Sequence, residues 1–134
     1  MSKWDTSSTT TMTSLFSDAT AFRGAGVGFW NTAKVVHMGS MFAGATFFDA
    51  DLGNANDVTD IWKTSLVTTM RAMFAKTDSF TGVGLGKFDI STICSTCTKD
   101  SKSGFVNMFS NAVGLTSCSK RKVLEGWKSS TCEE

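Results

Sequence analysis

A nineteen-residue stretch occurs four times in this chain, the fourth time interrupted by a nine-residue insertion before Phe105, and it constrains the fold more than any other feature. Its clearest copy spans residues 62–80 and reads WKTSLVTTMRAMFAKTDSF. The first residues of the four copies, which we call the openers, are Trp4, Trp30, Trp62 and Phe88, and they lie 26, 32 and 26 residues apart. A recurrence of this kind, with a period in the twenties, is typical of proteins whose repeated units stack on one another.

Each copy carries one apolar stripe. In the copy at 62–80 the stripe begins eight residues after the opener and consists of Met70, Met73, Phe74, Thr77 and Phe80. This i, i+3, i+4, i+7, i+10 spacing predicts a helical segment of about two to three turns. The seven residues before the stripe are rich in Thr, Ser and Val, which predicts a short strand.

A unit this small cannot bury its stripe alone, whereas stacked units share one continuous core. We therefore expect an α/β solenoid that forms a single domain over residues 1–134. Its expected units are 4–29, 30–61, 62–87 and 88–117, with a C-terminal cap at 118–134. The side chains expected to be buried between units are Met41, Phe42, Phe48, Met70, Met73, Phe74 and Phe80. Trp30 and Trp62 should stack at equivalent sites, with Phe88 in the last unit and each indole N–H bonded to a backbone carbonyl.

Both ends of the stack should depart from the repeat. In the first copy, Thr9 replaces the valine of the next two copies and SSTTT is almost wholly polar, which is typical of a terminal unit with one open face. That face would be covered by a neighbour or by a further stretch of a parent protein. At the other end, the spacing of Val123, Leu124 and Trp127 predicts one face of a short helix, begun after Ser119, that lies over the last unit.

The charge distribution gives no support for nucleic-acid binding. The net charge is +1, with three basic and six acidic groups in residues 1–60 and ten and six in residues 61–134. The basic cluster at 120–122 has no interleaved aromatic residues, so we interpret it as a solvated surface. No apolar run approaches the ~20 residues of a membrane span, and no signal peptide opens the chain. We expect no transmembrane segment.

The second copy carries six extra residues within DADLGNANDVTD, residues 49–60. This segment should form an exposed loop, and it superficially resembles a twelve-residue calcium loop. Its glycine, however, stands one place early, and an aspartate replaces the terminal glutamate. Stretches rich in Asp and Asn more often form turns, so we expect no metal. The calcium alternative would use Asp49, Asp51, Asp57 and Asp60.

All four cysteines lie in the last 41 residues, at Cys94, Cys97, Cys118 and Cys132. Zinc ribbons need two tight pairs and redox C-x-x-C motifs need a βαβ setting, and neither is present. We predict two disulfides that staple the cap, with one of Cys94 or Cys97 bonded to Cys118 or Cys132; four free thiols are the alternative. Disulfides would place the protein in an oxidising compartment, either extracellular, at a cell surface or in an organelle lumen.

Two columns of side chains should face a partner. The first contains Asp5, Asn31, Lys63 and Asp89, and the second, beside it, contains Thr6, Thr32, Thr64 and Ile90. Alternatively, these threonines satisfy backbone groups of turns. With a single histidine and no motif that supplies a nucleophile or an acid–base pair, we expect neither an enzyme nor a cofactor.

The pattern W-D-T-S-x-V-x-x-M-x-x-M-F-x-x-A-x-x-F resembles the 26-residue surface-protein repeat of mycoplasma lipoproteins, which is related to BspA-like leucine-rich repeats and is also found in algae. The residues that carry the resemblance are Trp4 to Ser7, Ala45, Phe48, Val67, Met70, Met73 and Phe74. It implies a right-handed, leucine-rich-repeat-like solenoid of about four coils, with short parallel strands on one side and short helices on the other.

The resemblance implies a binding scaffold and supplies no catalytic residues. We expect a non-catalytic protein–protein interaction module, or a structural subunit of a larger assembly, whose partners are other proteins. The alternative is adhesion to a regular surface, polysaccharide or ice, through Ser/Thr ladders.

Overall fold

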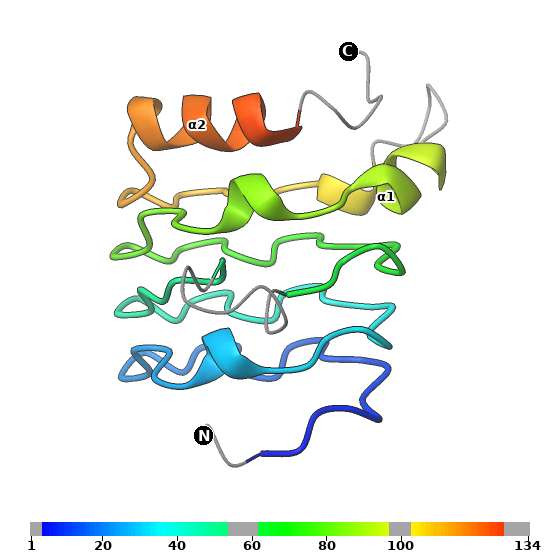
Figure 1. Ribbon diagram of the computed structural model, residues 1–134. Helices are drawn as coiled ribbons and strands as arrows, with labels where there is room; N and C mark the ends of the chain where they lie inside the picture. The colour runs from blue at the N-terminus through cyan, green and yellow to red at the C-terminus, as the bar shows by residue number, and fades with distance from the viewer. Residues whose placement is uncertain (1–3, 54–61, 97–102, 128–134) are drawn as a thin grey trace.

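The computed structural model describes residues 4–53, 62–96 and 103–127. Within them the chain winds through superposed layers from the N-terminus to the C-terminus, and one helix lies across the C-terminal end (Figure 1). The helices are η1 (Val27–Phe29), η2 (Leu85–Lys87), α1 (Ser91–Thr96), η3 (Ser103–Phe105) and α2 (Ser117–Trp127). Each layer starts at an opener, and we number the layers 1 to 4 from the N-terminus.

The predicted α/β solenoid and its leucine-rich-repeat character are wrong. The described residues contain no sheet; their only β-type pairs outside named strands are two isolated parallel bridges, which join Thr11 to His37 and His37 to Thr69. The expected helices on the apolar stripes are also missing, because residues 12–22, 38–48 and 70–80 form turns. We call these three ranges, together with the equivalent residues 105–115, the turn segments.

Backbone conformation explains why the stripes are not helical. In every layer the residues ten and fourteen positions after the opener adopt positive φ, allowing for the nine-residue insertion in layer 4. These residues are Ser14, Asp18, Ser40, Gly44, Ala72, Lys76, Asn107 and Asn111, with φ between 53° and 72°. Single left-handed residues interrupt a right-handed helix. Consecutive i→i+3 hydrogen bonds, such as Ala75 N–H to the Ala72 carbonyl, take the place of helical turns.

Alternate residues of the turn segments in layers 1 to 3 bond to the next layer. The N–H groups of Met12, Ser14, Phe16 and Asp18 donate to the carbonyls of His37, Gly39, Met41 and Ala43 at 2.6–2.9 Å. The same four positions of layer 2 donate to Thr69, Arg71, Met73 and Ala75, and those of layer 3 donate to Gly104, Val106, Met108 and Ser110. Every layer therefore presents N–H donors toward the following layer and carbonyl acceptors toward the preceding one along this edge.

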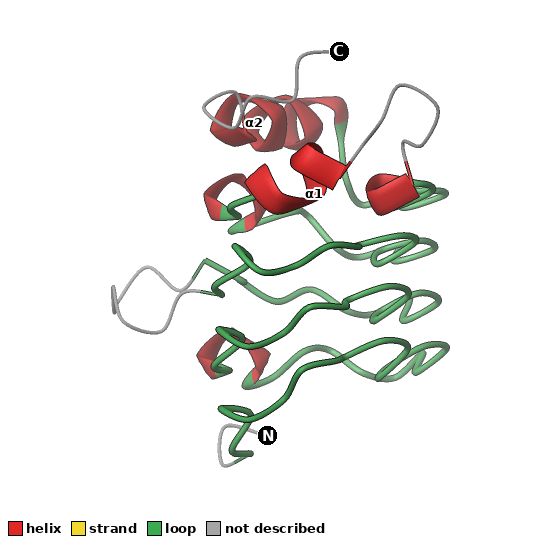
Figure 2. Cartoon of the chain, turned by 90° about the vertical axis from the view of Figure 1, so that its right-hand side faces the viewer, coloured by secondary structure: helices red, strands yellow, loops and turns green. Residues whose placement is uncertain are grey.

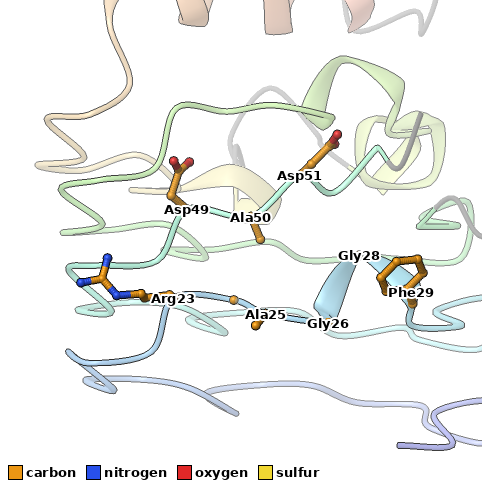
Figure 3. A pocket seen from close by; sticks show the side chains of 9 residues that line it. Arg23, Ala25, Gly26, Gly28, Phe29, Asp49, Ala50 and Asp51 are labelled. Carbon is orange, nitrogen blue, oxygen red and sulfur yellow. The ribbon is translucent and has the colours of Figure 1, made fainter. Parts of the chain in front are cut away.

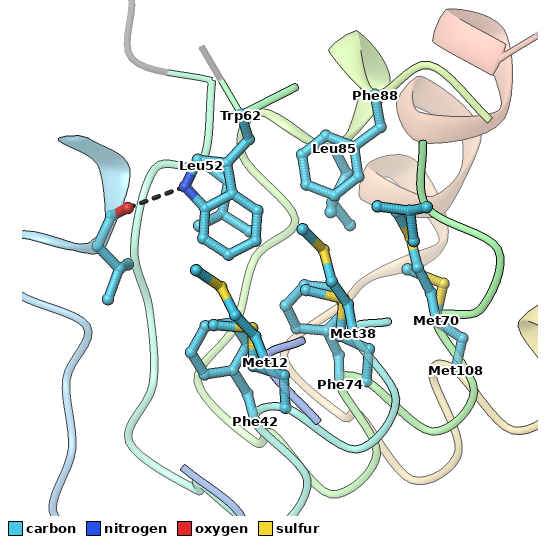
Figure 4. Close-up of a cluster of buried hydrophobic side chains, with 14 of the residues drawn as sticks. Met12, Met38, Phe42, Leu52, Trp62, Met70, Phe74, Leu85, Phe88 and Met108 are labelled. Atoms are coloured by element: carbon cyan, nitrogen blue, oxygen red, sulfur yellow. Dashed lines mark hydrogen bonds between the residues drawn. The ribbon is translucent and has the colours of Figure 1, made fainter. Parts of the chain in front are cut away.

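Columns of side chains fill the interior. The phenylalanines twelve positions after each opener stack at centroid distances of 5.9, 5.7 and 6.0 Å, in the order Phe16, Phe42, Phe74 and Phe109. Met12, Met38 and Met70 form a second column (Figure 4). The seven side chains predicted to be buried all have an exposed fraction of 0%. This prediction is confirmed. Stacked turns bury the side chains at these sequence positions just as stacked helices would.

The openers follow the prediction only in part. Trp30 and Trp62 are each 1% exposed, and the indole N–H of Trp62 donates to the Val27 carbonyl at 2.8 Å (Figure 4). The rings of Trp4 and Trp30 stack at 5.7 Å, and those of Trp62 and Phe88 stack at 5.9 Å. Among the described residues no ring stack joins Trp30 to Trp62; these two rings contact Phe16 and Phe42 of the preceding layers instead.

Helix α2 covers the C-terminal end, as the sequence predicts, but it begins at Ser117 and not after Ser119. Val123 is 4% exposed, and Trp127 stacks on Phe105 at 5.6 Å and donates its indole N–H to the Leu85 carbonyl at 2.8 Å. The helix approaches η2 so closely that a Cβ on Gly126 would lie 2.7 Å from the carbonyl carbon of Gly86. Figure 2 shows α2 above the layers at this end. The side chain of Leu124, also predicted to face the last layer, lies outside the described residues.

Candidate interaction surface

The opener-flanking column that was predicted to face a partner is exposed. The side chains of Asp5, Asn31 and Asp89 each accept a hydrogen bond from the N–H two residues later, at 3.0, 3.1 and 3.0 Å. Each bond closes a small turn in which a side-chain oxygen replaces a backbone carbonyl. Lys63 takes this place in layer 3, is also exposed, and supplies no acceptor.

Two carboxylates of this column are held ionised. The Ser91 hydroxyl and the Ser91 N–H bond to Asp89 and keep the pKa of its carboxyl below the ordinary value. The Ser7 hydroxyl and N–H lower the pKa of Asp5 in the same way. At neutral pH the column therefore runs negative, neutral, positive and negative from layer 1 to layer 4.

The threonine column is not available to a partner. Thr32 and Thr64 are each 1% exposed, so their prediction as surface residues is wrong. Their hydroxyls donate to the Lys63 and Asp89 carbonyls of the following layers at 3.0 and 2.9 Å, and Thr6 donates to Asn31 in the same way. The alternative interpretation, in which these threonines satisfy backbone groups, describes the structure.

The open side of layer 1, which we call the N-terminal face, exposes large apolar side chains. Trp4 is 52% exposed and Leu15 is 46% exposed. At the same positions of layers 2 and 3, the tryptophans are 1% exposed, and Met41 and Met73 are completely buried. Trp4, Leu15, Met12 and Trp30 line a hollow of about 430 Å³ together with the polar side chains of Asp5, Thr6, Thr9 and Thr11.

A second hollow, of about 310 Å³, lies where the ends of layers 1 and 2 meet (Figure 3). Asp49 and Asp51 line it, but one oxygen of each carboxylate is engaged: Asp49 accepts from the Thr81 N–H and hydroxyl, and Asp51 accepts from the Gly53 N–H at 2.7 Å. The other two residues of the calcium alternative, Asp57 and Asp60, lie outside the described residues. Within the described part no three His, Cys, Asp or Glu side chains gather to hold a metal ion.

Only one cysteine side chain can be placed. Cys118 is exposed and carries a free thiol, which differs from its predicted role in a disulfide. Cys94 belongs to α1, but its side chain, like the whole of Cys97 and Cys132, lies outside the described residues. A disulfide that uses Cys118 therefore has no support in the structure, and a bond among the other three stays a prediction.

Within the part of the chain that the structure describes, no helix is long and apolar enough to span a bilayer. No curated protein and no solved structure matches the chain. The described residues form a stack of turn-built layers, which α2 covers at the C-terminal end and which these residues leave uncovered at the N-terminal end. The chain belongs to the family described as "Mycoplasma protein of unknown function, DUF285", which matches residues 1–112. This agrees with the mycoplasma part of the resemblance; a relation to BspA-like leucine-rich repeats is not shown.

Proposed function

We propose that the protein is a non-catalytic protein–protein interaction module, or a structural subunit of a larger assembly, that binds a partner protein through its N-terminal face. The observation that supports this proposal is the exposure of Trp4 and Leu15 at positions where the next two layers are buried. Exposed apolar patches with a polar rim are typical of protein interaction sites. Asp5 and Thr11 supply such a rim around the hollow.

Trp4 can serve as the anchor residue of this face. Half-exposed aromatic side chains of this size contribute much of the binding energy in protein interfaces when a partner covers them. Trp4 is also held in place before binding, because its ring stacks on Trp30 at 5.7 Å and on Phe16 at 6.5 Å. A pre-ordered anchor loses little conformational entropy on association.

The alternative of binding polysaccharide or ice gains no supporting observation, since the hydroxyls of Thr6, Thr32 and Thr64 donate to backbone carbonyls. For the location we propose a cell surface, on the grounds of the family match and of the resemblance to surface-protein repeats. An oxidising compartment stays part of that proposal and depends on the cysteines outside the described residues.

Site-specific photocrosslinking tests the proposed function. A photoreactive phenylalanine derivative replaces Leu15 in one variant and Val113, which is 72% exposed on layer 4, in a matched control. In extracts of the native source we expect one major crosslinked protein from position 15 and none from position 113. Excess wild-type protein should abolish the crosslink, and excess Leu15→Arg protein should not. Equal crosslinking from both positions, or none from position 15, contradicts the proposal.

A further inference from the structure

The N-terminal face carries a row of four backbone carbonyls that accept no hydrogen bond from the described residues. Carbonyls at four alternate positions of layers 2, 3 and 4 accept N–H groups from the layer before. The equivalent carbonyls of layer 1 belong to Thr11, Thr13, Leu15 and Ser17, and they accept no hydrogen bond from any described residue. We call these four oxygens the acceptor row. They lie along the same edge as the hollow, since Thr11 and Leu15 contribute to both.

The acceptor row defines which hydrogen-bond donors a partner must present. Three interlayer contacts in this protein show that four N–H groups on alternate residues of a turn segment match four such carbonyls, with N···O distances of 2.6–3.0 Å. The same turn segment places a Phe against the next Phe column at 5.7–6.0 Å. A partner that matches both the donors and the apolar side chains is a further layer of the same kind.

A second copy of this chain does not fit. Two N-terminal faces brought together would set acceptors against acceptors. The donor end of a second copy is its layer 4, where the N–H groups of Asn107, Phe109 and Asn111 make no hydrogen bond with the described residues. Helix α2 lies over that end, with Trp127 on Phe105 and Gly126 against Gly86, so α2 would have to be displaced first.

We infer that the N-terminal face docks a layer of the same turn-segment repeat, presented by a different polypeptide whose donor end is uncovered. The partner donates four backbone N–H groups to the acceptor row and lays its own opener and stripe against Trp4, Leu15 and Phe16. This inference rests on the proposed function and specifies the chemistry of the partner. Backbone pairing supplies the register, and the apolar contacts exclude water from it.

A tethered layer tests the inference on the full chain. Residues 62–87, the best-formed repeat, are added ahead of Trp4 in place of residues 1–3, so that docking becomes intramolecular. We expect the thermal midpoint to rise by about 5 °C, because an added matched layer contributes both its own stability and one interface. Quenching of Trp4 fluorescence by acrylamide should fall, measured against a Trp4→Phe version of the same extended chain.

A control chain disrupts the donor edge of the added layer. In it, proline replaces the residue that corresponds to Ala72, which removes an N–H that donates to layer 4 in the parent protein and also prevents the positive φ of that position. This control should have the thermal midpoint of the parent chain and unchanged quenching of Trp4. An extended chain with no rise in midpoint, or an equal rise in the control, would overturn the inference.

Two further results separate this inference from the proposed function. Sedimentation of the unmodified protein should give a monomer; a dimer that the Leu15→Arg substitution dissociates would show that a second copy is the occupant and overturn the inference. The protein crosslinked from position 15 should contain the W-x-T-S…M-F repeat. A single specific partner without that repeat would uphold the proposed function and overturn the inferred class of partner.

Discussion

The two ends of the stack differ in how the apolar face of the terminal layer is covered. At the C-terminal end, α2 covers layer 4, and the indole of Trp127 donates to Leu85 in the second 3-10 helix just as the indole of Trp62 donates to Val27 in the first. At the N-terminal end, Trp4 and Leu15 stay about half exposed. A helix can thus take the place of a missing layer by reproducing one buried tryptophan contact. At the N-terminal end the described residues supply no such element, and layer 1 exposes the side chains and carbonyls whose equivalents a neighbouring layer covers elsewhere.

The largest difference should appear between the interior and the open end. Phe74→Ala removes a completely buried ring from the central column and should lower the free energy of unfolding by about 3–5 kcal/mol. Phe16→Ala alters the same position of layer 1, where the ring is only half-buried, and should cost clearly less. Urea unfolding of both variants measures the difference; equal losses would mean that layer 1 is as well packed as layer 3.

Gly126→Ala probes the fit of α2 against the last layers. Within an exposed helix this substitution stabilises by up to about 1 kcal/mol. Here the new methyl group would meet the backbone of Gly86, so we expect a loss of about 1–3 kcal/mol from overpacking. The thermal midpoint of the variant should fall. A rise in the midpoint would show that α2 does not lie this close to η2.

Trp127→Phe tests the substitute hydrogen bond. The variant keeps an aromatic ring over Phe105 but loses the N–H that bonds Leu85, and should lose about 1 kcal/mol. Trp62→Phe removes the equivalent bond to Val27 at a site that is 1% exposed, and should lose more because water cannot replace the donor there. If both variants lose the same free energy of unfolding in urea, water is excluded from the Trp127 site under α2 as completely as from the interior.

Leu15→Ser should barely change stability. The side chain is 46% exposed, so the free energy of unfolding should stay within about 0.5 kcal/mol of wild type. Met73→Ala, at the same position of layer 3 and fully buried, should cost about 2–5 kcal/mol. A large loss from Leu15→Ser would show that this residue supports its own layer and is not kept for a partner.

The smallest effect concerns pH. Hydrogen bonds from Ser91 lower the pKa of Asp89 in the folded protein, so the unfolded chain takes up its proton at a higher pH. This contribution to stability is complete above the ordinary Asp pKa near 3.9 and is lost as the pH falls through the lower folded value. Asp89→Asn should flatten the stability profile below about pH 4 while keeping the turn, as Asn31 does in layer 2. An unchanged profile contradicts the assignment.

The sequence predicted the interior better than the backbone. The burial of Phe42 and Phe74 follows from the spacing of apolar residues, which a stack of turns and a stack of short helices share. The spacing could not reveal the left-handed residues that separate these two backbones. A signal for them was present: Asp18, Gly44, Asn107 and Asn111 are of the types that adopt positive φ most readily, and they recur at the same two positions.

The candidate surface was also predicted only in part. The exposure of Asp5, which follows the opener Trp4, could be predicted from its polarity. The same reasoning misplaced Thr32 and Thr64, since a hydroxyl can face either water or a carbonyl of the next layer. The acceptor row was missed altogether because backbone groups leave no mark in the amino-acid sequence. Only the direction of the interlayer hydrogen bonds reveals it.

That common direction has an electrical consequence. In β-sheets the dipoles of neighbouring peptide groups largely cancel, but peptide groups aligned head to tail add, as they do in a helix. The four aligned hydrogen bonds at each of three interfaces add in this way, so the turn-segment edge should have a dipole whose negative end lies at layer 1. Such a dipole would orient an approaching partner electrostatically before contact is made. The association rate should therefore fall as salt screens this field.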